Sequence, residues 1–223
     1  MRDLYRAVVL GDPGSGKSTL AEFLCHRLAT RYQEKFVLGR EMTPILVVLR
    51  EYGAFKISQP CSILKFIEIT AESKYNVKPP QGSLEYLLLN GRVLLIFDGL
   101  DELTDTSYRQ EIRDDIESFC NLYPSTPVLV TSRKIGYGQT PLDQERFELY
   151  RLAPFDEMRI GQYVVNWFEA DSERSTDEHK EKASCFLDES KIAGDLRANP
   201  LMLALMCNLY LSTEGGIYSQ KPS

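Results

Sequence analysis

The amino-acid sequence predicts an α/β fold in which a parallel sheet is covered by helices on both faces and is followed by a small all-helical subdomain. Apolar stretches such as "ILVVL" and "VLLIF" are continuous rather than alternating, as in strands that are buried on both faces. Segments with helical periodicity separate these stretches, which favours parallel strands joined by crossover helices. From Pro154 onward the pattern contains helical periodicity and no convincing strand.

The elements of the sheet region follow one another in regular alternation. The stretch "YRAVVLG" stops at a glycine, as a strand does, and Leu20, Phe23 and Leu24 share one face of the helix expected after it. Ile112 and Ile116 likewise share one side of the last helix of this region. Strands are expected at 5–11, 44–51, 92–99, 126–133 and 146–153, and helices at 17–35, 62–75, 83–89 and 107–122.

The change of pattern divides the chain into three parts. Residues 1–153 are expected to form the sheet domain, and residues 154–211 the all-helical subdomain. The end of the chain, 212–223, reads "STEGGIYSQKPS", which is polar with two glycines and is expected to be a linker or a disordered tail.

The composition narrows the class of protein. The 223 residues are 43% hydrophobic and 26% charged, with a net charge of −6, and no run of Lys and Arg exceeds two residues. A basic nucleic-acid-binding face therefore has no support. The apolar runs are too short to span a bilayer, and no secretory signal opens the chain. The five cysteines are scattered and only two histidines occur, which argues against structural zinc or a disulfide framework and fits the cytoplasm.

The clearest motif is "GDPGSGKST", which fits G-x-x-x-x-G-K-[ST] between a predicted strand and a predicted helix. Its glycines let the backbone N–H groups converge on an anion, and the helix adds its positive N-terminal end. Lys17 supplies a charge to the β- and γ-phosphates, and the Ser18 hydroxyl is a ligand for Mg²⁺. The expected phosphate-binding residues are Gly11, Asp12, Pro13, Gly14, Ser15, Gly16, Lys17, Ser18 and Thr19.

A second motif, "LLIFDGLDE", places three acids directly after a buried strand. Asp98 is expected at the carboxyl end of that strand, where it can hold Mg²⁺ opposite Ser18. Asp101 and Glu102 follow, where a carboxylate can orient or deprotonate the attacking water. Spacing does not decide which of these two acids acts on the water. The alternative to a catalytic role is that both acids cap the next helix.

A third motif, "VLVTSR", ends the fourth strand, which we expect between the first and the third. Its polar tip, with Thr131 and Ser132, would then face the γ-phosphate. Arg133 is a candidate phosphate sensor, because a guanidinium can bridge phosphate oxygens and carboxylates. An arginine after a strand is more often simply solvated.

These three motifs, in this order and spacing, resemble the NACHT module of the STAND class of P-loop ATPases, as in bacterial NACHT proteins. The stretches "TSRKIGYG" and "LRANPLMLALMC" resemble the continuation into the first helical domain, so the resemblance runs from Tyr5 to about Leu211. It implies a nucleotide-binding domain over 1–153 and a helical lid over 154–211. The winged-helix, effector and sensor regions of relatives have no counterpart, and the sequence is expected to be a fragment of a larger protein.

The function that the resemblance implies is an ATP/ADP-operated switch with slow ATP hydrolysis and Mg²⁺, in a signalling or antiviral defence protein of innate immunity. Self-association through neighbouring NACHT modules on activation is implied as well. Residue by residue, Lys17 and its neighbours bind phosphate, Asp98 binds the metal, Asp101 or Glu102 supports hydrolysis, and Arg133 senses phosphate. Pro200 matches a proline that packs on adenine; spacing alone favours a proline that starts a helix, and both can hold at once. Arg50 matches a recurring arginine without an assigned role.

Other functions compete with the switch. An AAA+-type motor or loader would also carry a helical lid, but no trans-acting arginine finger is identifiable. A small-molecule kinase needs an acceptor pocket and usually an arginine-rich lid, and the helical region here is acidic. The GTPase motifs N-K-x-D and D-x-x-G at the magnesium strand are absent, and a binding module without hydrolysis remains an alternative.

Overall fold

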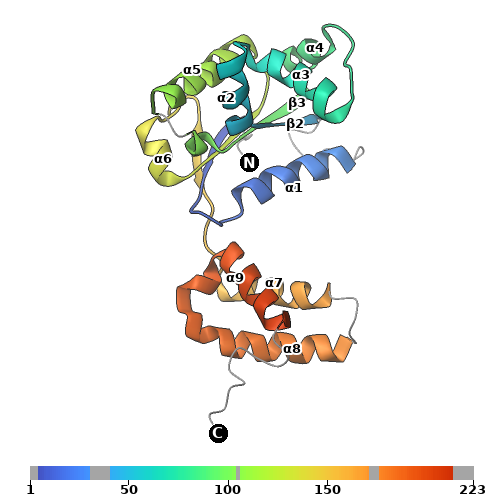
Figure 1. Cartoon of the computed structure of the whole chain (residues 1–223), viewed down its shortest axis with the longest axis vertical. Coiled ribbons are helices and arrows are strands. Elements are labelled where there is room, and N and C mark those ends of the chain that lie inside the picture. Colours follow the sequence, from blue (N-terminus) through green and yellow to red (C-terminus); the bar gives the residue numbers. More distant parts are fainter. Residues whose placement is uncertain (1–4, 31–40, 104–105, 171–175, 213–223) are drawn as a thin grey trace. The chain divides into compact units, whose positions relative to one another are not determined.

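The computed structural model describes residues 5–30, 41–103, 106–170 and 176–212, and these fall into two compact units. The first holds the chain up to Pro13 and Lys17–Leu152, and the second holds Gly14–Gly16 and the chain from Ala153. Figure 1 shows the order of the elements along the chain. The predicted extension of the first helix beyond residue 30 and the predicted tail from 213 lie outside the described residues.

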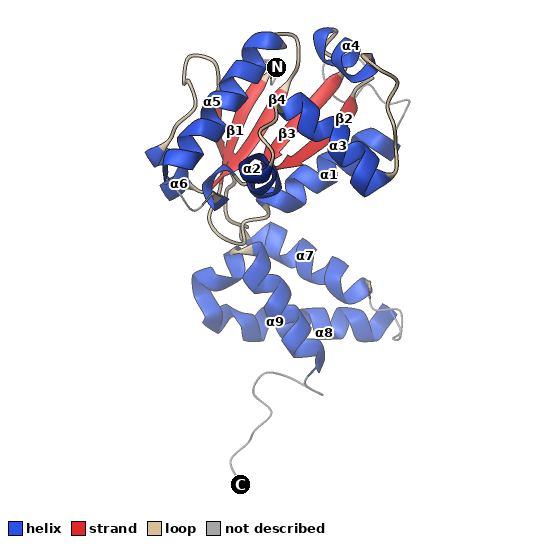
Figure 2. Ribbon diagram, turned by 45° about the horizontal axis from the view of Figure 1, so that its top comes forward, coloured by secondary structure: helices blue, strands red, loops and turns tan. Residues whose placement is uncertain are grey.

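The first unit is built on a sheet whose five described strands all run parallel, in the order β2-β3-β4-β1-β5 (Figure 2). This confirms the predicted α/β class, and it puts β4 between β1 and β3 as expected. Because all strands point the same way, their carboxyl ends meet at one edge of the sheet. The strands are β1 (Arg6–Leu10), β2 (Thr43–Val48), β3 (Val93–Asp98), β4 (Val128–Ser132) and β5 (Glu148–Arg151).

Helices cover both faces of this sheet. The side chains of β3 alternate between the faces: Leu95 and Phe97 join one hydrophobic cluster, whereas Leu94 and Ile96 pack with α1 in another. The fold therefore buries β3 on both sides, as its continuous apolar sequence predicted. The elements between the strands are α1 (Lys17–Thr30), α2 (Leu49–Ser58), α3 (Ile63–Tyr75), α4 (Ser83–Leu89), the 3-10 turn η1 (Leu100–Glu102), α5 (Thr106–Leu122) and α6 (Lys134–Gln139).

Two of these helices were missed from the sequence. The strand expected over 44–51 ends at Val48, and α2 starts at Leu49, because a continuous apolar run carries no period that distinguishes strand from helix. The helix α6 contains Gly136 and Gly138, which disfavour helix in isolation. Its position is set by tertiary contacts described below. Phe23, predicted to share one face of α1 with Leu20 and Leu24, is 52% exposed, whereas those two leucines are partly buried.

The second unit has its own hydrophobic core, and its described residues after Leu152 form helices and connecting segments without a strand. Asp156 caps the first of its helices, since its carboxylate accepts from the Arg159 N–H at 2.8 Å. Tyr210 packs edge to face with both Phe168 and Phe186 in its centre, and these two phenylalanines are tilted against each other. Its helices are α7 (Glu157–Glu169), α8 (Thr176–Glu189), the 3-10 segment η2 (Ser190–Ala198) and α9 (Pro200–Ser212). None of the helices in the described ranges is both long enough and apolar enough to cross a bilayer.

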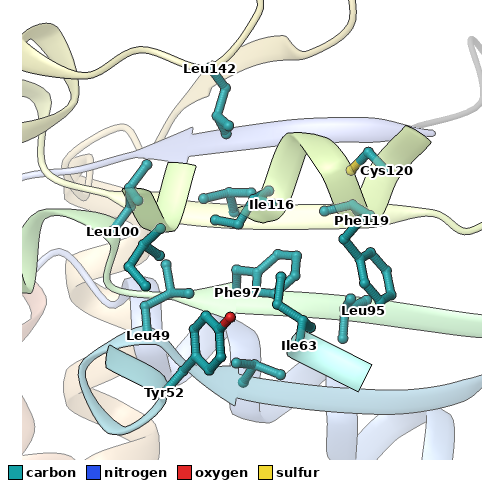
Figure 3. Close-up of a cluster of buried hydrophobic side chains, with 14 of the residues drawn as sticks. Leu49, Tyr52, Ile63, Leu95, Phe97, Leu100, Ile116, Phe119, Cys120 and Leu142 are labelled. Atoms are coloured by element: carbon teal, nitrogen blue, oxygen red, sulfur yellow. The ribbon is translucent and has the colours of Figure 1, made fainter. Parts of the chain in front are cut away.

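The core of the first unit centres on Phe97 of β3, which is fully buried beneath α5 (Figure 3). Its ring meets that of Phe119 edge to face, with centroids 6.2 Å apart. Ile112 and Ile116 are also fully buried, which confirms the predicted apolar side of α5. Because β3 also carries Asp98, this packing holds the strand whose tip forms the candidate site.

Phe97→Ala should lower the free energy of unfolding by about 3–5 kcal/mol, because it leaves a cavity in a close-packed core. Urea denaturation monitored by circular dichroism measures the loss. Tyr86→Ala, at an exposed position of α4, is the matched control and should change it by less than about 0.5 kcal/mol. Equal losses in both variants would contradict the assignment of Phe97 to the centre of the core.

Candidate nucleotide-binding site

The loop between β1 and α1 carries the glycine-rich motif at the carboxyl edge of the sheet. Gly14 and Gly16 have φ angles of 76° and 90°, in the region that side chains other than glycine rarely adopt. These angles let the chain curl between Leu10, where β1 ends, and Lys17, where α1 begins. The curl leaves the N-terminus of α1, a helix of 14 residues, open at the end of the loop.

Lys17 folds back over this loop. Its Nζ donates to the carbonyl of Gly11 at 2.9 Å and to that of Asp12 at 3.1 Å. Burial lowers the pKa of the Lys17 ammonium, and the nearby carboxylates of Asp101 and Asp98 act in the opposite direction. A cation is thus held against the loop, next to the acidic tip of β3.

Asp98 is the most closely constrained side chain of the site. Its Oδ2 accepts from the Ser18 hydroxyl at 2.8 Å, and its Oδ1 accepts from the Thr131 hydroxyl at 2.5 Å. The Thr131 oxygen in turn accepts from the Gly99 N–H at 2.9 Å. Ser18, Asp98 and Thr131 come from three separate segments, so the fold assembles this chain of hydrogen bonds. A hydroxyl and a carboxylate side by side form an all-oxygen donor set, which fits Mg²⁺.

Thr131 does not have the position that the sequence predicted. Its side chain is fully buried and lies behind Asp98, so it supports the carboxylate rather than facing a phosphate as part of a polar tip. Ser132 is buried as well. Among the three residues at the end of "VLVTSR", only Arg133 is exposed.

Gly99 makes the turn that brings the next two acids to the site. Its φ of 82° starts the 3-10 turn η1, and a Cβ here would lie 3.1 Å from the Glu102 Cδ atom. A larger residue would therefore strain the backbone and crowd Glu102. The motif "DGLDE" thus needs its glycine for the turn itself.

Asp101 and Glu102 have different surroundings. The Asp101 side chain is only 7% exposed; its Oδ1 accepts from the Arg133 N–H at 2.7 Å and its Oδ2 lies 3.0 Å from Arg133 Nε. The Glu102 side chain is 36% exposed, and its nearest charged contact is Arg50, 3.6 Å away. Both oxygens of Asp101 are therefore engaged by one arginine, whereas Glu102 is accessible.

Arg133 contacts the site through Asp101. The Nε group and the main-chain N–H of Arg133 both bind this carboxylate, while half of the arginine side chain stays exposed. The structure thus brings Arg133 to the carboxyl edge of the sheet, next to the predicted acids. Pro200 is the first residue of α9 in the helical unit, and its contact with adenine stays a prediction.

Arg109 is a residue of this region that the sequence analysis missed. It lies in α5, is 7% exposed, and donates to the main-chain carbonyls of Asp101 and Leu103. A signal was present in the spacing: Arg109 precedes Ile112 by three residues and Ile116 by seven, which places it on the apolar face of the helix. An arginine on the buried face of a helix indicates specific partners, because long charged side chains are seldom buried without them.

The model of the NACHT domain matches residues 5–171. The chain belongs to the NACHT domain family. It is therefore a P-loop NTPase. The glycine-rich loop, the acidic motif after β3 and the arginine after β4 of this NACHT domain meet at the carboxyl edge of its sheet. No curated protein sequence matches the chain.

Solved structures share the fold of this NACHT domain at low sequence identity. The structure of C. elegans PCH-2 has 12% identity and a TM-score of 0.50, and the match covers 96% of this chain and 63% of that one. The structure of Drosophila ORC bound to DNA has 14% identity and a TM-score of 0.54, with 94% and 56% covered. The chain thus spans less than two thirds of the length of either, and the likeness concerns the fold alone.

Thr131→Val should raise the Mg²⁺ concentration needed for half-maximal ATP hydrolysis about 5- to 10-fold, because the loss of a hydrogen bond worth about 1 kcal/mol leaves Asp98 less well oriented. Thr126→Val is the matched control. Thr126 lies just before β4 and is equally buried, but its hydroxyl donates to the Leu88 carbonyl in α4 rather than to Asp98. An unchanged Mg²⁺ dependence in Thr131→Val, or the same change in Thr126→Val, would contradict the role given to Thr131.

Proposed function

We propose that this NACHT domain is an ATP- and ADP-binding switch that hydrolyses ATP slowly within a signalling or defence protein. The observation that carries the proposal is the contact of Ser18 with Asp98 at 2.8 Å beside the Lys17 ammonium. It joins the start of α1 to the tip of β3, where a nucleotide phosphate and its metal ion require a cation, a hydroxyl and a carboxylate together.

Phosphate binding is assigned to residues 11–19. The curled loop and the N-terminus of α1 offer main-chain N–H groups to an anion, and the left-handed Gly14 and Gly16 permit that curl. Lys17 is the positive charge of the site. The carbonyls of Gly11 and Asp12 hold its ammonium, which has three N–H donors and can also donate to a phosphate oxygen. This part of the site explains nucleotide binding without any contribution from the acids after β3.

The metal ion is assigned to Ser18 and Asp98. When bound there, Mg²⁺ supplies positive charge that offsets the negative charge of the phosphates. The hydroxyl groups of Ser18 and Thr131 already fix both Asp98 oxygens, so the carboxylate does not have to be ordered when the metal ion binds.

The attacking water is assigned to Glu102. Its carboxylate is accessible, and its ion pair with Arg50 is long and exposed, so little free energy is needed to break that pair. Asp101 is already committed to Arg133 through both oxygens. We therefore assign Glu102 as the general base and Asp101 as the residue that orients Arg133, whose exposed guanidinium contacts the transferred phosphate.

The switch itself is proposed on the support of family membership and goes beyond the site. Self-association with neighbouring NACHT modules on activation, effector and sensor domains in a longer protein, and action in the cytoplasm are parts of the same proposal. The nucleotide that copurifies with the chain reports on it directly. Tightly held ADP, released by heat and identified by chromatography, supports a latched switch, whereas an empty site with brisk turnover contradicts it.

Lys17→Ala should abolish binding of ADP and ATP while the far-ultraviolet circular dichroism stays the same, because the variant removes the cation that holds the phosphates. Isothermal titration calorimetry with Mg-ADP measures the effect. Lys191→Ala, at an exposed position in the helical unit, should bind as the wild type does. Unchanged affinity in Lys17→Ala would count against the phosphate site.

Glu102→Gln should keep ADP affinity within about two-fold and lower kcat by roughly 10²- to 10⁴-fold, as expected for removal of a general base. Steady-state phosphate release measures kcat. Glu51→Gln is the control: Glu51 follows Arg50 directly in the sequence, but its carboxylate pairs with Lys74 rather than with Arg50. Undiminished turnover in Glu102→Gln would remove Glu102 from its catalytic role.

A further inference from the structure

We infer that Arg109 is a positioning residue for ATP hydrolysis: its buried guanidinium holds Asp101 and Arg133 in the arrangement that the reaction uses. The inference rests on the proposed function for its kinetic consequence, and on contacts within the sheet unit for its geometry. Arg109 touches neither the phosphate-binding loop nor Asp98 in any contact of the described residues, so it acts through other side chains.

The Arg109 guanidinium links two elements that follow different strands. Its Nη2 donates to the carbonyl oxygens of Leu103 at 2.6 Å and Asp101 at 3.3 Å, in and after the turn η1 that follows β3. Its Nη1 donates to Gln139 Oε1 at 2.9 Å and to the Gly136 carbonyl at 3.4 Å, in α6, which follows β4. One planar fork therefore fixes η1 and α6 against α5.

The same two elements carry the Asp101–Arg133 pair. Asp101 belongs to η1, and Arg133 immediately precedes α6, whose first turn closes with the Tyr137 N–H donating to the Arg133 carbonyl at 3.0 Å. Asp101 also packs on Gly136, where an added Cβ would lie 2.4 Å from the Asp101 Cβ. Any shift of α6 relative to η1 therefore moves Arg133 relative to Asp101.

A lysine could not replace this arrangement. The fork of arginine reaches acceptors on both sides at once, whereas a lysine ammonium is a single point at the end of a flexible chain. The site of Arg109, on the side of α5 that also buries Ile112 and Ile116, would accept an apolar residue for packing alone. The arginine at this position is thus explained by what its fork connects.

The kinetic experiment compares Arg109→Lys and Arg109→Gln with Arg113→Gln. Arg113 lies one turn further along α5 and binds its neighbour Asp114, so it is a matched control outside the site. Arg109→Lys and Arg109→Gln should lower kcat by roughly 10²-fold, as a small misplacement of reacting groups does, with ADP affinity within about two-fold. In the Asp101→Asn background, Arg109→Lys should lower kcat no further, because both changes release Arg133.

A second measurement reads the geometry without any turnover. The Arg133 N–H is bonded to Asp101 at 2.7 Å, and its hydrogen exchange in the nucleotide-free protein reports whether that bond is held. Exchange at Arg133 should be faster in Arg109→Lys and slow in Arg113→Gln. Gly136→Ala, which keeps the Arg109 side chain but displaces Asp101 against α6, should reproduce both the faster exchange and the lower kcat.

The outcomes separate the inference from the proposed function. Unchanged exchange and kcat in Arg109→Lys overturn the inference, and so does faster exchange with unchanged kcat, which would show a purely structural role. If Arg109→Gln does not fold, the kcat and the exchange rates of Arg109→Lys and Gly136→Ala decide whether the inference holds. If the wild-type chain hydrolyses no ATP, the proposed function fails, whereas the exchange rates still confirm or overturn the Arg109 contact.

Discussion

The structure depends on one constraint: the carboxylate of Asp98, at the end of an otherwise buried strand, is held by two hydroxyl groups from different segments. Thr131 fixes it from β4, and Ser18 fixes it from the start of α1. Asp98 is the one partly exposed residue of β3, and the two hydrogen bonds fix the orientation of its carboxylate. They also hold the start of α1, the end of β3 and the end of β4 together, so that the glycine-rich loop lies next to the acidic turn.

The rest of the site follows from what happens after Asp98. A left-handed Gly99 turns the chain, and the two acids that follow it acquire different partners. Asp101 is enclosed by Arg133, and Glu102 stays accessible beside Arg50. Two adjacent carboxylates in one short turn thus have different surroundings, because the fold engages Asp101 and leaves Glu102 at the surface.

Much of this was predictable from the sequence. The place of β4 between β1 and β3 and the association of Ser18 with Asp98 follow from motifs that fix both local structure and position at the sheet edge. The start of α2 at Leu49 was not predictable, since an unbroken apolar run has no period. The helix α6 was missed because its two glycines oppose helix formation, and only tertiary contacts such as that of Arg109 with Gln139 stabilise it. The burial of Thr131 depends on a neighbour 33 residues away in the sequence, which no local pattern records.

The central claim is that Ser18 and Asp98 share a metal ion at the phosphate-binding loop. Crystals grown with ADP and Mn²⁺ in place of Mg²⁺ test it most directly, because manganese gives an anomalous signal that locates the ion. We expect one strong peak within coordination distance of the Ser18 hydroxyl and beside Asp98, next to the nucleotide phosphates. Nucleotide bound with the manganese peak elsewhere, or with no peak at this place, would contradict the account.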